Sequence, residues 1–161
     1  MKRIRWVCVC GCLLLSLSAC SKKQEVPKEV KACDVIPQPD VQAVFGGAAK
    51  VDTTGGTANK CCADVPGMKL CATIARGIAG LSARDKYNVY VAELTGKYPG
   101  QQILPEGVAD LGDTSGWLAN VGELFVFKGN VLLSLTANPP EKATLAQMKA
   151  LAEKAVPRLP Q

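Results

Sequence analysis

Two alternating apolar segments, residues 61–65 and 68–76, flank the pair Pro66-Gly67. Proline followed by glycine favours a reverse turn, so the two segments are predicted to pair as an antiparallel β-hairpin. A turn centred on this pair sets the register, in which Val65 lies opposite Met68 and Cys62 lies opposite Cys71. The residues that then share one face are all apolar: Cys61, Ala63, Val65, Met68, Leu70, Ala72 and Ile74. The hairpin therefore predicts a sheet with one apolar face and one more polar face.

The remaining segments alternate between helical and strand patterns. Thr144 and Gln147 form a capping box that starts a helix, and Ser82 with Asp85 resembles one. The expected elements are a helix near 40–45, strands at 48–54, 61–65 and 68–76, a helix at 82–94 stopped by Gly96, strands at 116–119, 123–128 and 131–137, and a helix from 144 to Pro157. This order predicts an α+β fold, with an antiparallel sheet of about six strands in two meanders and helices packed on it.

The N-terminus has the layout of a secretory signal. Basic residues are followed by an apolar run, residues 6–17, which is shorter than the roughly 20 residues that span a membrane. The run ends at Leu17-Ser18-Ala19-Cys20, which resembles the lipobox of bacterial lipoproteins. The resemblance implies that residues 1–19 are a signal peptide and that Cys20 carries the lipid anchor, with diacylglycerol on its sulfur and a palmitate-type chain on its amine. Several acyl chains hold a protein stably on a membrane, so the membrane is an expected partner.

The region after the lipobox sets the expected location and domain boundaries. In a two-membrane envelope, Ser21 in place of Asp implies an outer-membrane lipoprotein that faces the periplasm or the cell surface. In a single-membrane envelope, the same anchor stays on the outer leaflet of the plasma membrane. Residues 20–32 are expected to be the lipidated cysteine with a flexible polar tether, and residues 33–161 are expected to form one domain.

Charge and composition exclude several classes of function. The formal net charge is +5, but residues 33–161 hold 12 basic and 12 acidic side chains, so we expect no nucleic-acid partner. The chain contains no histidine. This excludes Ser-His-Asp and Cys-His catalysis and His-ligated metal or haem. Since no other catalytic motif is present, the protein is expected not to be an enzyme and to need no cofactor.

Four cysteines belong to the expected domain, and exported cysteines meet an oxidising environment. Four cysteines allow three pairings. Cys61 points to the apolar face, where the first helix would begin, and this favours a Cys33–Cys61 disulfide. Cys62 and Cys71 lie opposite each other on the other face, at a separation that a disulfide accepts. The alternative is a four-thiolate copper or zinc site, but adjacent Cys61 and Cys62 lack the usual ligand spacing, so we expect no metal.

Two further groups of residues are candidate sites. Tyr98 and Trp117 could line a possible ligand groove, although the alternative is that Trp117 is an ordinary core residue. Glu106, Asp110 and Asp113 place carboxylates in a glycine-rich loop. The spacing of an EF-hand calcium loop is absent, so a solvated loop is expected there.

Several short motifs occur in a defined order along the domain. They are Cys-Asp-Val-Ile at 33–36, Phe-Gly-Gly at 45–47, Gly-Val-Ala-Asp-Leu-Gly-Asp at 107–113, Lys-Gly-Asn-Val-Leu-Leu at 128–133 and Ala-Leu-Ala-Glu-Lys-Ala at 150–155. In this order they resemble small secreted actinobacterial lipoproteins of unknown function and the extracellular sensor domain of a mycobacterial-type receptor kinase, with a PsbP-like fold. The resemblance spans most of residues 33–158 and implies an extracytoplasmic, non-enzymatic domain. This chain departs from the family pattern in having more cysteines.

Two functions are consistent with these expectations. The first is a membrane-anchored, extracytoplasmic binding or sensing module whose ligand is an unidentified protein or small molecule. The alternative is an envelope inhibitor or immunity lipoprotein that blocks a toxin or a hydrolase. Both kinds of protein are small, anchored and free of catalytic residues.

Overall fold

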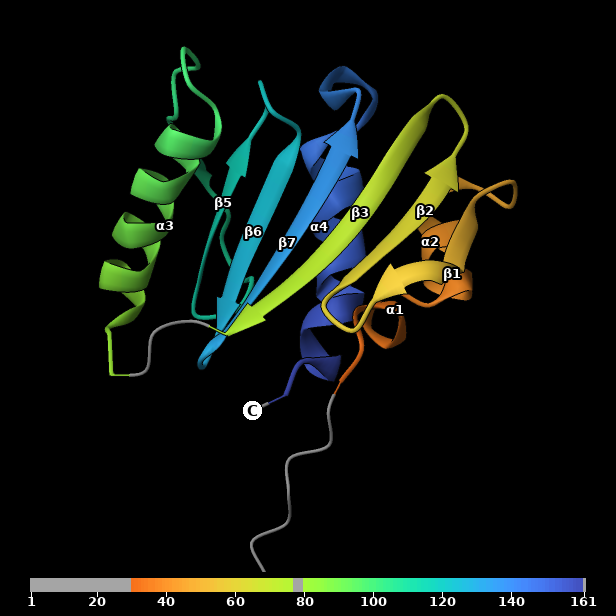
Figure 1. The fold of residues 1–161 in the computed structure, drawn as a ribbon, viewed down its shortest axis with the longest axis horizontal. Coiled ribbons are helices and arrows are strands. Elements are labelled where there is room, and N and C mark those ends of the chain that lie inside the picture. Colours follow the sequence, from red (N-terminus) through yellow and green to blue (C-terminus); the bar gives the residue numbers. More distant parts are fainter. Residues whose placement is uncertain (1–29, 77–79, 161) are drawn as a thin grey trace, which may run out of the picture.

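The computed structural model describes residues 30–76 and 80–160, which form an α+β fold with one antiparallel sheet (Figure 1). The sheet has seven strands in the order β1-β2-β3-β7-β6-β5-β4. The strands are β1 Lys50–Thr57, β2 Lys60–Val65, β3 Met68–Arg76, β4 Glu106–Gly107, β5 Thr114–Leu118, β6 Glu123–Lys128 and β7 Val131–Asn138. The expected number was about six. The additional strand is β4, which is too short for its sequence to show an alternating pattern.

The sheet joins two sequential sets of strands, β1–β3 and β4–β7. They meet where β3 pairs with β7, in a ladder that runs from Lys69 opposite Asn138 to Arg76 opposite Val131. The last strand of each set therefore lies near the middle of the sheet. One face of both central strands lies against the main core.

The hairpin around Pro66-Gly67 has the predicted register. Val65 pairs with Met68, and Cys62 pairs with Cys71. Gly67 has a φ of 79°, a left-handed conformation that glycine adopts without steric cost. The apolar face of β2 and β3 is buried, while Cys62, Cys71 and Thr73 on the other face are partly exposed. Turn chemistry and alternation together were enough to predict this part of the fold.

Four α-helices and two short 3-10 helices accompany the sheet. The α-helices are α1 Ala32–Val35, α2 Gln38–Phe45, α3 Ala83–Lys97 and α4 Leu145–Ala155, and the 3-10 helices are η1 Pro140–Lys142 and η2 Val156–Arg158. Ser82 accepts a hydrogen bond from the backbone N–H of Asp85, and Thr144 and Gln147 form the expected capping box. Helix α1 was not predicted, because its four residues are too few to show a helical period.

The end of α3 differs from the prediction. Gly96 was expected to stop the helix, but α3 continues to Lys97. A helical glycine costs about 1 kcal/mol relative to alanine. Lys97 compensates by pairing with Glu123 of β6 at 2.8 Å, a tertiary contact that the local sequence does not reveal.

The two faces of the sheet are covered unequally. On one face, α1, α2 and α4 enclose the main core, which includes Leu70, Leu133 and Met148. On the other face, α3 packs on β5 and β6 with a smaller cluster around Phe125 and Leu94. In Figure 1, α4 lies behind the strands and α3 lies beside β5, while the front of β7, β3 and β2 carries no helix.

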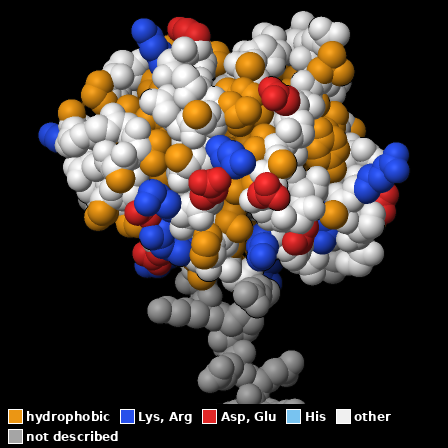
Figure 2. All heavy atoms as spheres, turned by 180° about the vertical axis from the view of Figure 1, so that it is seen from behind, with side chains coloured by type: hydrophobic (Ala, Val, Ile, Leu, Met, Phe, Trp, Pro, Cys, Tyr) orange, Lys and Arg blue, Asp and Glu red, His pale blue; other side chains and the backbone are white. Residues whose placement is uncertain are grey.

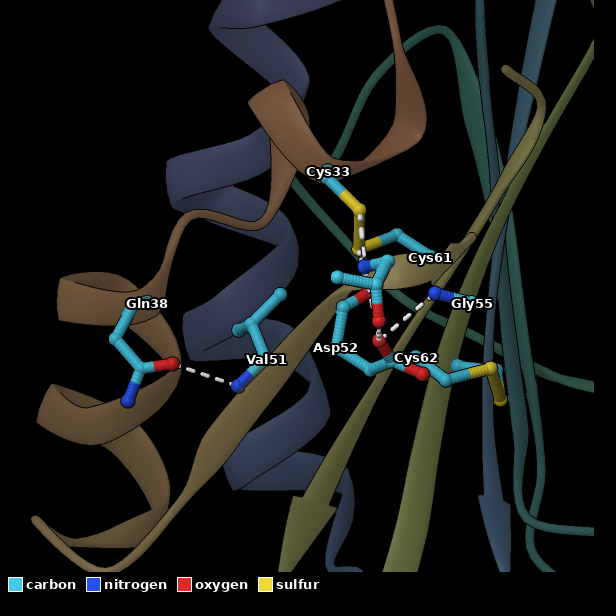
Figure 3. Close-up of a disulfide and its surroundings, with 9 residues drawn as sticks. Cys33, Gln38, Val51, Asp52, Gly55, Cys61 and Cys62 are labelled. Carbon is cyan, nitrogen blue, oxygen red and sulfur yellow. Dashed lines mark hydrogen bonds between the residues drawn. A yellow bond between two sulfur atoms is a disulfide. The ribbon is translucent and has the colours of Figure 1, made fainter. Parts of the chain in front are cut away.

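The N-terminal helices cover the β1 edge of the sheet. The amide of Gln38 donates to the Ala49 carbonyl at 2.7 Å, and its oxygen accepts from the Val51 N–H at 2.6 Å (Figure 3). The side chain thus makes both hydrogen bonds that a neighbouring strand would make. Asp52 accepts from the backbone N–H of Gly55 at 2.8 Å, which also turns the strand. A sheet edge capped in this way is protected against pairing with another chain.

Charges on the helical side of the molecule are mixed. Figure 2 shows that side from behind, with basic and acidic side chains interspersed among apolar ones. Within residues 30–76 and 80–160, none of the helices has the length and apolar character needed to cross a membrane.

Candidate functional site: the α3 cleft

The uncovered part of the sheet forms one side of an open cleft, and α3 forms the other. The cleft has a volume of about 810 Å³, and we call it the α3 cleft. Its polar lining comes from β2, β3, β7 and the end of α3, and includes Lys60, Thr73, Lys97, Tyr98, Ser134 and Thr136. The position is a direct result of the fold, because α3 packs on β5 and β6 and leaves the face of β7 and β3 open.

A buried carboxylate lies behind the lining of the cleft, where its partners Tyr90, Lys97, Tyr98 and Ser134 form part of the wall. Glu123 has no exposed surface. Its oxygens accept hydrogen bonds from the hydroxyl groups of Tyr90 at 2.5 Å, Tyr98 at 2.9 Å and Ser134 at 2.8 Å. The Lys97 ammonium donates at 2.8 Å and supplies the opposite charge. A carboxylate that is removed from water is stable only with partners of this kind.

The pKa values in this network follow from burial and hydrogen bonding. Burial by itself would raise the pKa of Glu123, but the hydrogen bonds from Lys97, Tyr90 and Ser134 outweigh it and hold the pKa below its ordinary value. Burial raises the pKa of Tyr90, and the Glu123 charge raises it further. Partial burial would lower the pKa of Lys97, yet its hydrogen bond to Glu123 leaves that pKa raised. The network is therefore an ion pair with two neutral tyrosines at neutral pH.

Aromatic packing supports the same arrangement. The Tyr90 ring meets the Phe125 ring edge-on at 5.0 Å between centroids and meets Phe127 at 5.9 Å. Phe125 lies over Gly116, where a β-carbon would come within 2.5 Å of the ring. These contacts fix α3 on the sheet, so the cleft is formed before any ligand arrives.

The cleft changes character along its length. A smaller hollow of about 110 Å³ adjoins the polar part, and Ala75, Tyr90, Glu93 and Leu132 line both. Its own lining adds the apolar side chains of Leu81, Val89 and Phe127 and the charged side chains of Arg76 and Lys86. One end of the α3 cleft therefore offers a recess with several apolar side chains beside two basic ones, and the other end offers mainly hydroxyl and ammonium groups.

Both disulfides have the predicted pairing. Cys33 and Cys61 are joined with a Cα–Cα distance of 5.0 Å, and Cys62 and Cys71 with one of 4.0 Å. Cys33–Cys61 ties α1 to β2 next to the β1 edge (Figure 3). The four cysteines are thus two disulfides, which excludes the alternative in which all four act as thiolate metal ligands.

The structure does not bring Tyr98 and Trp117 together in a groove, and it agrees with the alternative that Trp117 is an ordinary core residue. Trp117 is 6% exposed and belongs to the main core on the α4 side. Tyr98 packs with the smaller cluster on the α3 side. Trp117 and Leu118 are neighbours in β5, so they point to opposite faces, and Leu118 is the residue that faces α3.

The loop that carries Glu106, Asp110 and Asp113 was expected to be solvated, and these residues are exposed in the structure. No group of three His, Cys, Asp or Glu residues within residues 30–76 and 80–160 gathers as a metal site. Asp113 instead accepts a hydrogen bond from the Gly129 N–H at 2.6 Å. Residues 1–29, which include Cys20, the predicted signal peptide and most of the predicted tether, lie outside the described residues.

Sequence reasoning missed the central residue, Glu123. The sequence did contain a sign that Glu123 is unusual, because Glu123 shares one strand face with Phe125 and Phe127. A carboxylate on an apolar face needs hydrogen-bonding or charged partners. The partners could not be named from the sequence, since Lys97 and Tyr90 lie 26 and 33 residues away.

Comparisons of this chain with protein-family models, with curated proteins and with solved structures find no match. The function must therefore be inferred from the residues and the geometry.

Proposed function

We propose that this protein is a membrane-anchored, extracytoplasmic lipoprotein that acts as a non-enzymatic binding or sensing module. The observation that carries the proposal is the α3 cleft, an open site whose walls are held by a fully paired buried carboxylate and by aromatic packing. The lipobox-like motif at Cys20 and the resemblance to secreted lipoproteins and a receptor-kinase sensor domain support the location.

The lining favours an amphiphilic ligand. The recess formed by Leu81, Val89 and Phe127 has a volume of about 110 Å³, which suits one small apolar group. At the other end, Lys60 presents an exposed ammonium group beside the hydroxyls of the β3 and β7 floor. A ligand with an apolar group and an anionic or hydroxylated group would satisfy both ends.

The experiment is native mass spectrometry of the full chain purified in mild detergent from the cells that produce it. We expect a bound mass that is lost on denaturation. Thr73→Trp should abolish it, because the indole would fill the floor of the cleft. The matched control is Thr53→Trp, which places the same side chain at an exposed position on the edge strand β1.

Two outcomes would count against the proposal. A bound mass that survives Thr73→Trp would place the ligand elsewhere. Recovery of a stoichiometric envelope enzyme whose activity is blocked by this chain, with no other bound mass, would support the inhibitor function instead.

A further inference from the structure

The two disulfides occupy different surroundings. Cys61 is fully buried, and Cys33, although partly exposed, packs against the main core where it joins α1 to the sheet. Cys62 and Cys71 are both partly exposed, and neither belongs to a hydrophobic cluster of the described residues. They lie on the face of β2 and β3 that carries no helix from residues 30–76 and 80–160 (Figure 1). A thiol reagent can therefore approach the second bond without displacing a covering element.

The sheet holds Cys62 and Cys71 together independently of their bond. They are opposite residues in a hairpin ladder that extends from Lys60–Thr73 to Val65–Met68. Both strands are paired again on their outer sides, where Asp52 lies opposite Cys62 and Thr136 lies opposite Cys71. The four-strand ladder keeps the two sulfur atoms near each other after reduction, so the bond can re-form readily.

The length of chain that each disulfide closes also favours Cys62–Cys71 as the bond that can open without unfolding the protein. Cys62–Cys71 links positions 9 residues apart, whereas Cys33–Cys61 links positions 28 residues apart and attaches a helix to the sheet. The chain gains little conformational entropy when a disulfide that closes a short hairpin loop is reduced. Reduction of Cys62–Cys71 should therefore leave the fold intact, while reduction of Cys33–Cys61 would release α1.

We propose that Cys62–Cys71 is a thiol–disulfide exchange site for a dithiol oxidoreductase, and that it cycles between disulfide and dithiol in the folded protein. Cys33–Cys61 is a permanent structural bond. The inference rests on the proposed function only for the partner's location in the cell envelope, since the exchange itself depends on the exposed pair alone.

The exchange takes place in two successive displacement steps at sulfur. A thiolate of the partner attacks one sulfur of the pair, a mixed disulfide forms, and the other sulfur leaves as a thiolate that takes up a proton. The partner's second thiol then attacks the mixed disulfide and forms the partner's own disulfide. Two electrons and two protons pass from the partner to Cys62 and Cys71.

The test uses the full mature chain in its oxidised form, with dithiothreitol and with a purified thioredoxin-type protein as reductants. Thiols released under native conditions are alkylated, the remaining disulfides are then reduced and labelled with a second reagent, and peptides are mapped by tandem mass spectrometry. We expect Cys62 and Cys71 to be labelled at least about tenfold faster than Cys33 and Cys61, with the circular dichroism spectrum unchanged. A thioredoxin variant that lacks its resolving cysteine should form a covalent adduct.

The control is the double variant Cys62→Ala/Cys71→Ala, which should give neither the fast labelling phase nor the adduct. Equal rates at both disulfides, earlier reduction of Cys33–Cys61, or release of thiols only on global unfolding would overturn the proposal. These results do not depend on lipidation or on ligand binding, so failure of the proposed function would be seen separately.

Discussion

At the scale of single residues, Glu123 is the position on which the α3 cleft depends. Its carboxylate is fully buried and accepts hydrogen bonds from three hydroxyl groups and one ammonium group. Glu123→Gln removes the charge that pairs with Lys97 and replaces an acceptor oxygen with a donor. We expect a loss of about 1–3 kcal/mol in the free energy of unfolding, measured by urea denaturation.

Glu93→Gln is the matched control, because Glu93 is an exposed carboxylate on α3 beside the same cleft. Its effect should stay within about 0.5 kcal/mol. If the two variants lose the same stability, the Glu123 network does not hold α3 on the sheet.

The same carboxylate predicts a pH dependence. The pKa of Glu123 in the folded protein lies below its ordinary value of 4.5. A group with a lowered pKa in the folded state contributes stability above its unfolded pKa, and this contribution is lost as the pH falls through the folded pKa. The stability difference between the wild type and Glu123→Gln, measured by urea denaturation at several pH values, should therefore be constant near neutrality and shrink below about pH 4.5. A difference that grows in acid would contradict this assignment.

At the scale of elements, the edge strand β1 depends on Gln38 of α2. Gln38→Ala removes two hydrogen bonds and leaves the Val51 N–H at the sheet edge without its partner, while the Ala49 carbonyl keeps its hydrogen bond from Gln42. We expect concentration-dependent self-association by analytical ultracentrifugation and a loss of about 1–2 kcal/mol in stability. Gln102→Ala, in an exposed loop segment, should leave the protein monodisperse at the same concentrations.

The two disulfides should differ in their contribution to stability. In the chain-entropy account, a bond across 28 residues contributes about 1 kcal/mol more than one across 9 residues. Cys33→Ala/Cys61→Ala should therefore lower the free energy of unfolding more than Cys62→Ala/Cys71→Ala does. Denaturant titration of both double variants checks the order, and the reverse order would mean that α1 contributes little to the fold.

The elements also show which features a sequence can predict. The hairpin at Pro66-Gly67 and the capping box at Thr144 depend on neighbouring residues, and the structure confirms both. The α3 cleft depends on where α3 comes to rest, and the contact that fixes it, Lys97 with Glu123, joins residues 26 positions apart. The sequence left Trp117 open between a groove and the core for the same reason, because alternation gives opposite faces of a strand but does not say which helix covers each face.

At the scale of the whole molecule, the sheet has one enclosed face and one open face. The enclosed face holds the main core and the Cys33–Cys61 bond. The open face carries both the α3 cleft and the Cys62–Cys71 bond, and Thr73 of the cleft follows Cys71 on the same side of β3. The main core thus lies on one side of the sheet, and the α3 cleft, the Glu123 network and the Cys62–Cys71 bond lie on the other.

We propose that lipid at Cys20 holds this domain on a membrane. The most direct measurement is the intact mass and N-terminal peptide map of the protein isolated from the membrane fraction of the cells that produce it. The account predicts a chain that begins at Cys20, carries diacylglycerol and a further acyl chain, and contains two disulfides. A chain that retains residues 1–19, or an unacylated Cys20, would contradict it.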